Sequence, residues 1–148
     1  MHKQSGVGLI EVLVAVLVLS IGFLGIAALQ VMSMSTNNSA MARSMATVAS
    51  YSILDAMRAD IVNAKGGAYN TASSLKADAC PAASGSLANY QLNQWCNQLG
   101  QSLGPVATTT GLINCTATGD CTVTISFDDS RAGVGGTSNQ QVITKAML

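Results

Sequence analysis

Very few side chains in this sequence could carry out chemistry, and their positions exclude the common catalytic arrangements. The chain has one histidine, His2, and one glutamate, Glu11, among its 148 residues. A nucleophile activated by histidine, or a metal ion held by histidines, therefore has no candidate in the body of the chain. Asp128 and Asp129 are adjacent, so on a strand they point to opposite faces, and two carboxylates make a poor calcium site. We expect no enzyme activity, no metal and no cofactor.

Four cysteines, Cys80, Cys96, Cys115 and Cys121, form the other reactive group. An even number that follows an apolar segment is typical of two disulfides in an exported domain. A zinc site is the alternative, but it would need four thiolates, and no Cys-x-x-Cys pair is present. The last two cysteines flank a predicted hairpin turn and should face each other, while Cys80 would tie a loop to the helix that carries Cys96. Of three possible connectivities, we favour 80–96 with 115–121.

A long apolar segment dominates the N-terminal third of the chain. No charged residue occurs from Val12 to Met34, and this length is enough to cross a bilayer. Lys3 precedes the segment, so we expect the N-terminus to stay in the cytoplasm. A secretory signal peptide and a plain signal anchor are alternatives, but neither accounts for Glu11. A carboxylate costs about 2.5–3.5 kcal/mol at the centre of a membrane helix, and less near the interface, so Glu11 should have a partner.

The sequence around Glu11 is similar to a known signal. Residues 5–15 read SGVGLIEVLVA, and this resembles the class III signal of type IV prepilins: a short basic leader ending in glycine, then an apolar helix with glutamate at its fifth position. It departs from the usual Phe-Thr start in having Val7 and Gly8. The resemblance implies that prepilin peptidase cuts between Gly6 and Val7 and methylates Val7. Glu11 would then neutralise the terminal amine of a neighbouring subunit; a pair with its own amine is the alternative.

Other segments resemble the PilV-type minor pilins. They lie in order along the chain, at residues 9–16, 21–25, 29–30, 55–59, 67–70, the helix that carries Trp95, and 121–129. The resemblance implies a structural subunit that primes type IV pilus assembly, enters at or near the tip, and supports twitching motility and adhesion. It also implies a single-pass inner-membrane protein that later moves to the surface pilus. A pseudopilin of a type II secretion system is the runner-up, and a surface adhesin is a third possibility.

The implied partners are other minor pilins, the major pilin, prepilin peptidase and the inner-membrane assembly platform. Nucleic acid is not expected, because seven basic residues balance seven acidic ones and are scattered singly. Gly22 and Gly25 interrupt the apolar helix. Pilin helices often unwind locally in the fibre, so the resemblance implies flexibility at these glycines; close helix packing is the alternative.

The remainder of the chain predicts an α+β protein with a small antiparallel sheet packed on a long spine helix. Apolar residues spaced three and four apart between 39 and 63 continue the helix as an amphipathic one, with its methionines in the core and a stop at 66–67. A second helix carries Trp95 as its packing anchor. We expect strands at 112–115, 121–127 and 141–147. The expected divisions of the chain are a leader at 1–6, an apolar helix at 7–35 and a globular domain at 36–148.

Overall fold

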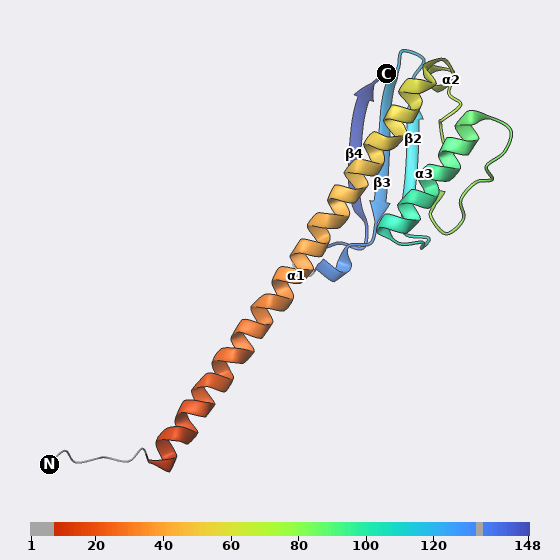
Figure 1. Cartoon of the computed structure of the whole chain (residues 1–148). Helices are drawn as coiled ribbons and strands as arrows, with labels where there is room; N and C mark the ends of the chain where they lie inside the picture. Colours follow the sequence, from red (N-terminus) through yellow and green to blue (C-terminus); the bar gives the residue numbers. More distant parts are fainter. Residues whose placement is uncertain (1–7, 133–134) are drawn as a thin grey trace.

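One long helix positions every other element of the chain. The computed structural model describes residues 8–132 and 135–148. Helix α1 spans Leu9–Ala59; its first half projects alone, and its second half lies against a domain of short helices and strands (Figure 1). The domain has α2 (Ile61–Lys65), α3 (Leu87–Leu103) and the 3-10 turn η1 (Ser130–Ala132). Its antiparallel sheet has the order β1 (Leu75–Lys76), β2 (Thr110–Cys115), β3 (Asp120–Phe127), β4 (Gln140–Met147). The predicted α+β class is confirmed.

Helix α1 ends three or four residues earlier than its apolar pattern suggests. Asp60 leaves the helical conformation, with φ −127° and ψ 48°. Its carboxylate accepts hydrogen bonds from Asn63 Nδ2 at 2.7 Å and from the Tyr69 hydroxyl at 3.1 Å. Both partners are side chains, so Asp60 holds this corner through Asn63 and Tyr69, and its side chain does not cap α2. The chain resumes as α2 and then stops at Gly67, which has φ +82°, as expected for a left-handed helix stop.

Tyr69 fixes this corner from inside the domain. The side chain is fully buried, and its hydroxyl is shared between Asp60 and the Gln91 side chain of α3. Burial, together with the hydrogen bond to Asp60 and its charge, raises the pKa of Tyr69 to about 12. The phenol therefore stays protonated and neutral at physiological pH, where it can donate to the carboxylate.

The core lies between the second half of α1, α3 and the inner face of the sheet. From α1 it takes Ala46, Ala49, Ile53, Leu54 and Met57, all at most 2% exposed. The prediction that the other methionines of this stretch are buried was wrong. Exposed fractions are 56% for Met41, 41% for Met45 and 58% for Val48. Ala46 and Ala49 allow close approach to α1, and Ile53, Leu54 and Met57 fill the core farther along the helix. Met41, Met45 and Val48 form a separate exposed row.

Trp95 joins α3 to both α1 and the sheet, as predicted for a packing anchor. Its indole is 2% exposed, and Nε1 donates to the Ala49 carbonyl oxygen at 2.9 Å. On the other side the ring lies over Gly111 of β2. A Cβ at Gly111 would lie 2.4 Å from Trp95 Cη2 and 2.9 Å from Leu99 Cδ1. Glycine is therefore required at this point of the strand.

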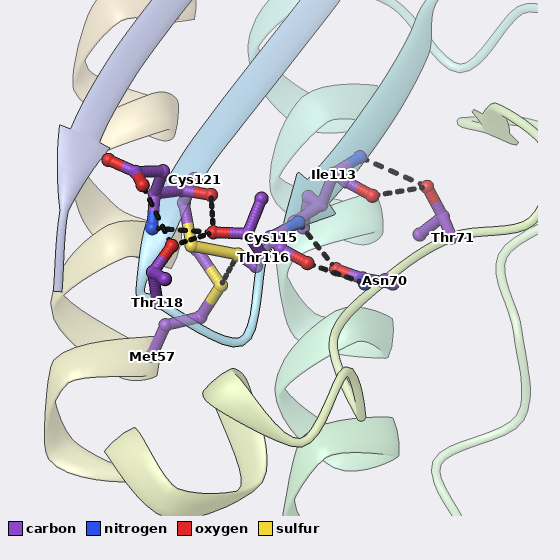
Figure 2. Close-up of a disulfide and its surroundings, with 9 residues drawn as sticks. Met57, Asn70, Thr71, Ile113, Cys115, Thr116, Thr118 and Cys121 are labelled. Carbon is purple, nitrogen blue, oxygen red and sulfur yellow. Dashed lines mark hydrogen bonds between the residues drawn. A yellow bond between two sulfur atoms is a disulfide. The ribbon is translucent and has the colours of Figure 1, made fainter.

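Two disulfides stabilise the domain; neither includes a residue of α1, and Cys115 Sγ lies 3.7 Å from Met57 Sδ of that helix. Cys80 pairs with Cys96 and Cys115 pairs with Cys121, with Cα–Cα distances of 5.6 and 4.1 Å; these are the pairs favoured from the sequence. The second bridge closes the β2–β3 hairpin, in which the two cysteines are register partners (Figure 2). Both bridges lie outside the apolar part of α1, in the part of the chain expected to be exported.

The segment after α2 clamps the outer side of β2 (Figure 2). Asn70 bonds Cys115 twice: Nδ2 donates to the Cys115 carbonyl at 3.0 Å, and the Cys115 N–H donates to Oδ1 at 2.7 Å. The Thr71 N–H donates to the Ile113 carbonyl at 3.0 Å, and the Ile113 N–H donates to Thr71 Oγ1 at 3.0 Å. This Asn70–Thr71 clamp continues the edge begun by β1. Neither the clamp nor β1 lies in a strand that the sequence predicts.

A methyl group at Gly111 tests the Trp95 contact. We expect Gly111→Ala to lower the free energy of unfolding by about 1–3 kcal/mol, because the added Cβ overpacks the indole. Asn114→Ala, at an exposed position of the same strand, should change it by less than about 0.5 kcal/mol. Denaturant unfolding of the full chain in detergent can be followed by the fluorescence of Trp95, the sole tryptophan. Equal stability of the two variants would contradict the packing argument.

Candidate assembly surface on the N-terminal helix

The first half of α1 presents a large apolar surface that the chain itself does not cover. Every residue from Gly8 to Met34 is exposed. One 18-residue window of α1 has a mean hydropathy of 2.9 with none of it buried, which is apolar enough to cross a membrane. Typical exposed side chains are Leu13, Leu17 and Phe23, each 60% exposed or more. An uncovered apolar area of this size indicates a surface that lipid or other chains cover.

Glu11 is the one acidic residue in the first turn of this helix. The helix starts at Gly8, whose backbone is extended (φ −69°, ψ 143°), and the Glu11 N–H donates to the Gly8 carbonyl at 2.9 Å. A carboxylate here is favoured by the positive end of the helix dipole. Its side chain is exposed and makes no ion pair with any residue that the structure describes. The expected cleavage and methylation positions, Gly6 and Val7, lie outside the described residues.

Gly22 and Gly25 lie within an unbroken part of α1. A Cβ built at either position meets no atom within 4 Å. Packing inside this chain therefore does not require glycine at these two positions. Local unwinding in a fibre and close packing against a neighbouring helix both stay predictions. Either one would explain the two glycines only in an assembly with other subunits.

A second exposed apolar row extends the surface toward the domain. Met34, Met41, Met45 and Val48 follow Phe23 on one face of the helix, by the 100° step between successive residues. All five side chains are at least 41% exposed. We call this row the helix stripe. It follows the apolar first half of α1, so exposed apolar side chains recur on this face from the start of the helix to the level of the sheet, with the polar residues Gln30 and Asn37 between them.

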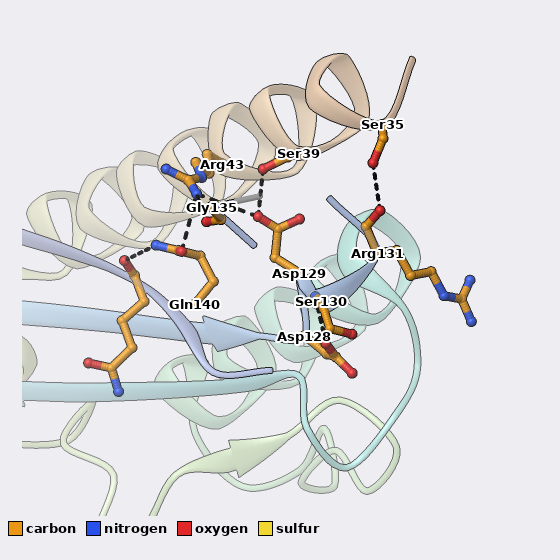
Figure 3. A network of polar contacts seen from close by, with 10 residues as sticks. Ser35, Ser39, Arg43, Asp128, Asp129, Ser130, Arg131, Gly135 and Gln140 are labelled. Atoms are coloured by element: carbon orange, nitrogen blue, oxygen red, sulfur yellow. Dashed lines mark hydrogen bonds and ion pairs between the residues drawn. The ribbon is translucent and has the colours of Figure 1, made fainter. Parts of the chain in front are cut away.

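A polar junction fixes the domain to the middle of α1 (Figure 3). Asp129, 7% exposed, accepts a hydrogen bond from Ser39 Oγ at 2.5 Å and lies 3.6 Å from Arg43 Nη2. Arg43 also donates to Gln140 Oε1 at 3.2 Å, and Ser35 Oγ donates to the Arg131 carbonyl at 2.6 Å. The segment between β3 and β4 is thereby held against the helix just beyond its apolar half.

The neighbouring carboxylate, Asp128, is not part of this junction. Asp128 points away from α1 (Figure 3) and accepts a hydrogen bond from the Ser130 N–H at 2.9 Å. That backbone hydrogen bond lowers the pKa of Asp128. The two aspartates face apart, as predicted for adjacent residues, and so do not form an acid–base pair. Among the residues that the structure describes, no group of three or more metal-binding side chains comes together.

Removal of the Asp129 carboxylate tests the junction. We expect Asp129→Ala to destabilise the full chain by about 1–3 kcal/mol, because the Ser39 hydroxyl and the Arg43 guanidinium lose a mostly buried partner. Asp128→Ala is the matched control at an exposed carboxylate, and a loss below about 1 kcal/mol is expected there. Hydrogen exchange of the β3–β4 segment should accelerate in the first variant only. Unchanged exchange in both would mean that the junction does not hold the segment.

Comparison with known proteins addresses only the N-terminal part of the chain. The family model for the prokaryotic N-terminal methylation motif matches residues 1–27. Comparisons with curated proteins and with solved structures give no significant match. The matched residues include Glu11, Gly22 and Gly25 and the first half of the exposed helix. The chain therefore carries a class III prepilin signal on a pilin-like α+β fold, which indicates a membrane-anchored structural protein of the type IV pilin or pseudopilin class.

Proposed function

We propose that this chain is a minor pilin that primes type IV pilus assembly and is incorporated at or near the pilus tip. The observation that carries the proposal is Glu11, the one acidic side chain at the start of an otherwise apolar and uncovered helix, within the methylation motif. In this role the protein is a subunit of a fibre that supports twitching motility and adhesion. It acts by contacts with other subunits and not by catalysis.

Processing would create the partner that Glu11 requires. Cleavage between Gly6 and Val7 by prepilin peptidase leaves a terminal amine, and N-methylation of Val7 keeps that amine cationic. Glu11 of one subunit then pairs with the amine of its neighbour inside the apolar fibre core. Leaving one member of such a buried pair unmatched costs about 3–5 kcal/mol. The pair therefore acts mainly by fixing the axial position of one subunit relative to its neighbour. A subunit at another position along the fibre axis would leave a buried charge without a partner.

The rest of the chain fits the same scheme. We take residues 1–6 as the leader, 7–35 as the helix that spans the inner membrane and later enters the fibre, and 36–148 as the domain outside. The N-terminus would lie in the cytoplasm, and the assembly platform would lift the subunit toward the surface. Two disulfides suit an oxidising compartment beyond the membrane. Unwinding at Gly22 and Gly25 would let the helix lengthen as it leaves the bilayer.

Partners follow from the two exposed surfaces of α1. The apolar first half contacts other minor pilins and the major pilin in the fibre core. The helix stripe, with Met41, Met45 and Val48 exposed, continues this contact along the domain, and the unbranched methionines adapt to neighbours of different shape. Because Glu11 is present, the subunit can sit beneath another one and receive its amine.

Loss of the Glu11 charge tests the assembly step. We expect Glu11→Gln to reduce the amount of this protein in sheared fibres by tenfold or more, because the amine of the neighbouring subunit is stranded. Glu11→Asp, which keeps the charge, should retain more of the protein in fibres than Glu11→Gln. Mass analysis of the N-terminal peptide should give methylated Val7 in all three proteins. Full incorporation of the Gln variant, or an uncut N-terminus in the parent, would contradict the proposed role.

A deletion strain separates the minor pilin from the pseudopilin. If the proposal holds, deletion abolishes or strongly reduces twitching and surface pili, and leaves type II secretion of a reporter protease unchanged. Complementation with the parent chain should restore twitching, and complementation with Glu11→Gln should not. Normal twitching with a secretion defect would instead assign the chain to the secretion system.

A further inference from the structure

The two edges of the sheet differ in whether the chain itself pairs their outward backbone groups. The strand order is β1-β2-β3-β4, so β4 forms one edge, while β1 and the outer side of β2 form the other. Along β2 that side is filled by β1 and, farther on, by the Asn70–Thr71 clamp. Beyond β1 the chain closes on itself again, because Ala79 forms a bridge with Lys76. This edge is therefore occupied by the chain itself.

The edge formed by β4 is open along its whole length. All eight residues of β4 pair with β3, from Gln140 with Phe127 to Met147 with Asp120. Beyond the strand, the Leu148 N–H donates to the Gly119 carbonyl at 2.9 Å. Since bonded pairs alternate along an antiparallel ladder, residues 141, 143, 145 and 147 turn their N–H and C=O groups outward. Within the described part of the chain, one hydrogen bond reaches these groups, from Gln140 Nε2 to the Gln141 carbonyl at 3.3 Å.

We propose that the outer edge of β4 is a docking site for an edge strand of a different subunit of the same fibre, which extends the sheet by backbone hydrogen bonds. The inference rests on the proposed function, because it takes the partner to be anchored in the same membrane. Among macromolecular partners, a row of outward N–H and C=O groups at every second residue is matched by an extended backbone. Affinity then comes from the main chain and selectivity from side chains.

Lys145 supplies the selectivity. Natural edge strands are usually protected by proline, bulges or charged side chains, lysine above all; β4 has no proline, and Lys145 is its one charged residue. Its side chain is exposed and has no ion pair among the residues that the structure places. A lysine opposes pairing with an uncharged or basic strand and favours one with a carboxylate at the facing position. The partner strand should therefore carry an aspartate or glutamate opposite or diagonal to Lys145.

The direction of β4 argues against a second copy of this chain as the partner. The strand begins beside Arg43, which bonds Gln140, and ends where Leu148 and Lys65 both approach Gly119. It therefore runs in the same direction as α1 (Figure 1). Antiparallel pairing of two β4 edges would point the two α1 helices in opposite directions, which one membrane does not allow. Parallel pairing would place them on opposite faces of the joined sheet, where their stripes could not meet.

The remaining way to pair two copies uses the other edge, and that edge is closed. β1 has two residues, and the Ala79 bridge covers its outer side. A strand of β4's length would find no matching ladder there. The occupant is accordingly a different anchored subunit whose own edge strand is open and is at least as long as the outward row from Gln141 to Met147.

Site-specific photo-cross-linking in cells tests the proposal on the full chain. With p-benzoylphenylalanine in place of Ile143, we expect one cross-linked protein, identified by mass spectrometry, that differs from this chain and has its own apolar N-terminal helix. The matched control carries the same probe in place of Asn114, which is exposed on the same face two strands away from the edge. Cross-linking from the control should be at least tenfold weaker.

Proline variants distinguish a backbone contact from a side-chain contact. Lys145→Pro removes an outward N–H and leaves the β3 ladder intact, so the cross-link from Ile143 should fall at least tenfold. Lys145→Ala keeps the N–H and should weaken it only a few fold. Met147→Pro repeats the test at a second outward position, and intact disulfides on non-reducing gels show that each variant has folded. A cross-link to a second copy of this chain, no cross-link at all, or one unaffected by both prolines would overturn the proposal.

A probe in place of Met45 separates failure of this inference from failure of the proposed function. The helix stripe should cross-link to fibre subunits whether or not the β4 edge is used. Cross-links from position 45 with none from position 143 would overturn the docking edge and leave the minor pilin role intact. If the protein is absent from fibres and neither position cross-links, both the edge and the role are wrong.

Discussion

Helix α1 has to remain one element while its two halves meet different surroundings. Its first half exposes apolar side chains on every face, and its second half buries one face against α3 and the sheet. A break between the halves would separate the anchor from the domain. No proline occurs in the helix, and serine or threonine hydroxyls bond back to carbonyls four residues earlier at Ser20, Thr36, Ser44 and Thr47. These hydroxyl groups are therefore accommodated without interrupting the helix.

The packing of the domain follows from this constraint. The helix continues past the core as one element. The domain approaches it at Ala46 and Ala49 and bonds it at two levels, through Trp95 and Asp129. The face of α1 that is left over carries large apolar side chains and becomes the helix stripe. The same helix thus provides the core on one side and an assembly surface on the other, and neither face could be enlarged without reducing the other.

Sequence reasoning succeeded where a local pattern determined the structure. The uncharged run and the position of Glu11 identified the anchor, and the spacing of Cys115 and Cys121 around a turn placed them opposite each other. It failed for Met41 and Met45, because they lie on the face of α1 that does not pack against the domain, whereas Met57 is buried as predicted. The Asn70–Thr71 clamp and the Ser39–Asp129 contact join residues far apart in the sequence. Nothing in either local pattern specifies its partner, so these features required the structure.

The arrangement of contacts along α1 has a mechanical consequence. Neither disulfide includes a residue of α1; both join parts of the domain to each other. A force that pulls on the helix along its axis therefore reaches the domain through noncovalent contacts and through the chain at Asp60. The Trp95 and Asp129 contacts join the domain to the side of α1, at Ala49 and at Ser39, so such a force loads both in shear and strains them together. Tension is thereby shared along α1. If the domain shifts along the helix, the disulfides keep the domain itself folded.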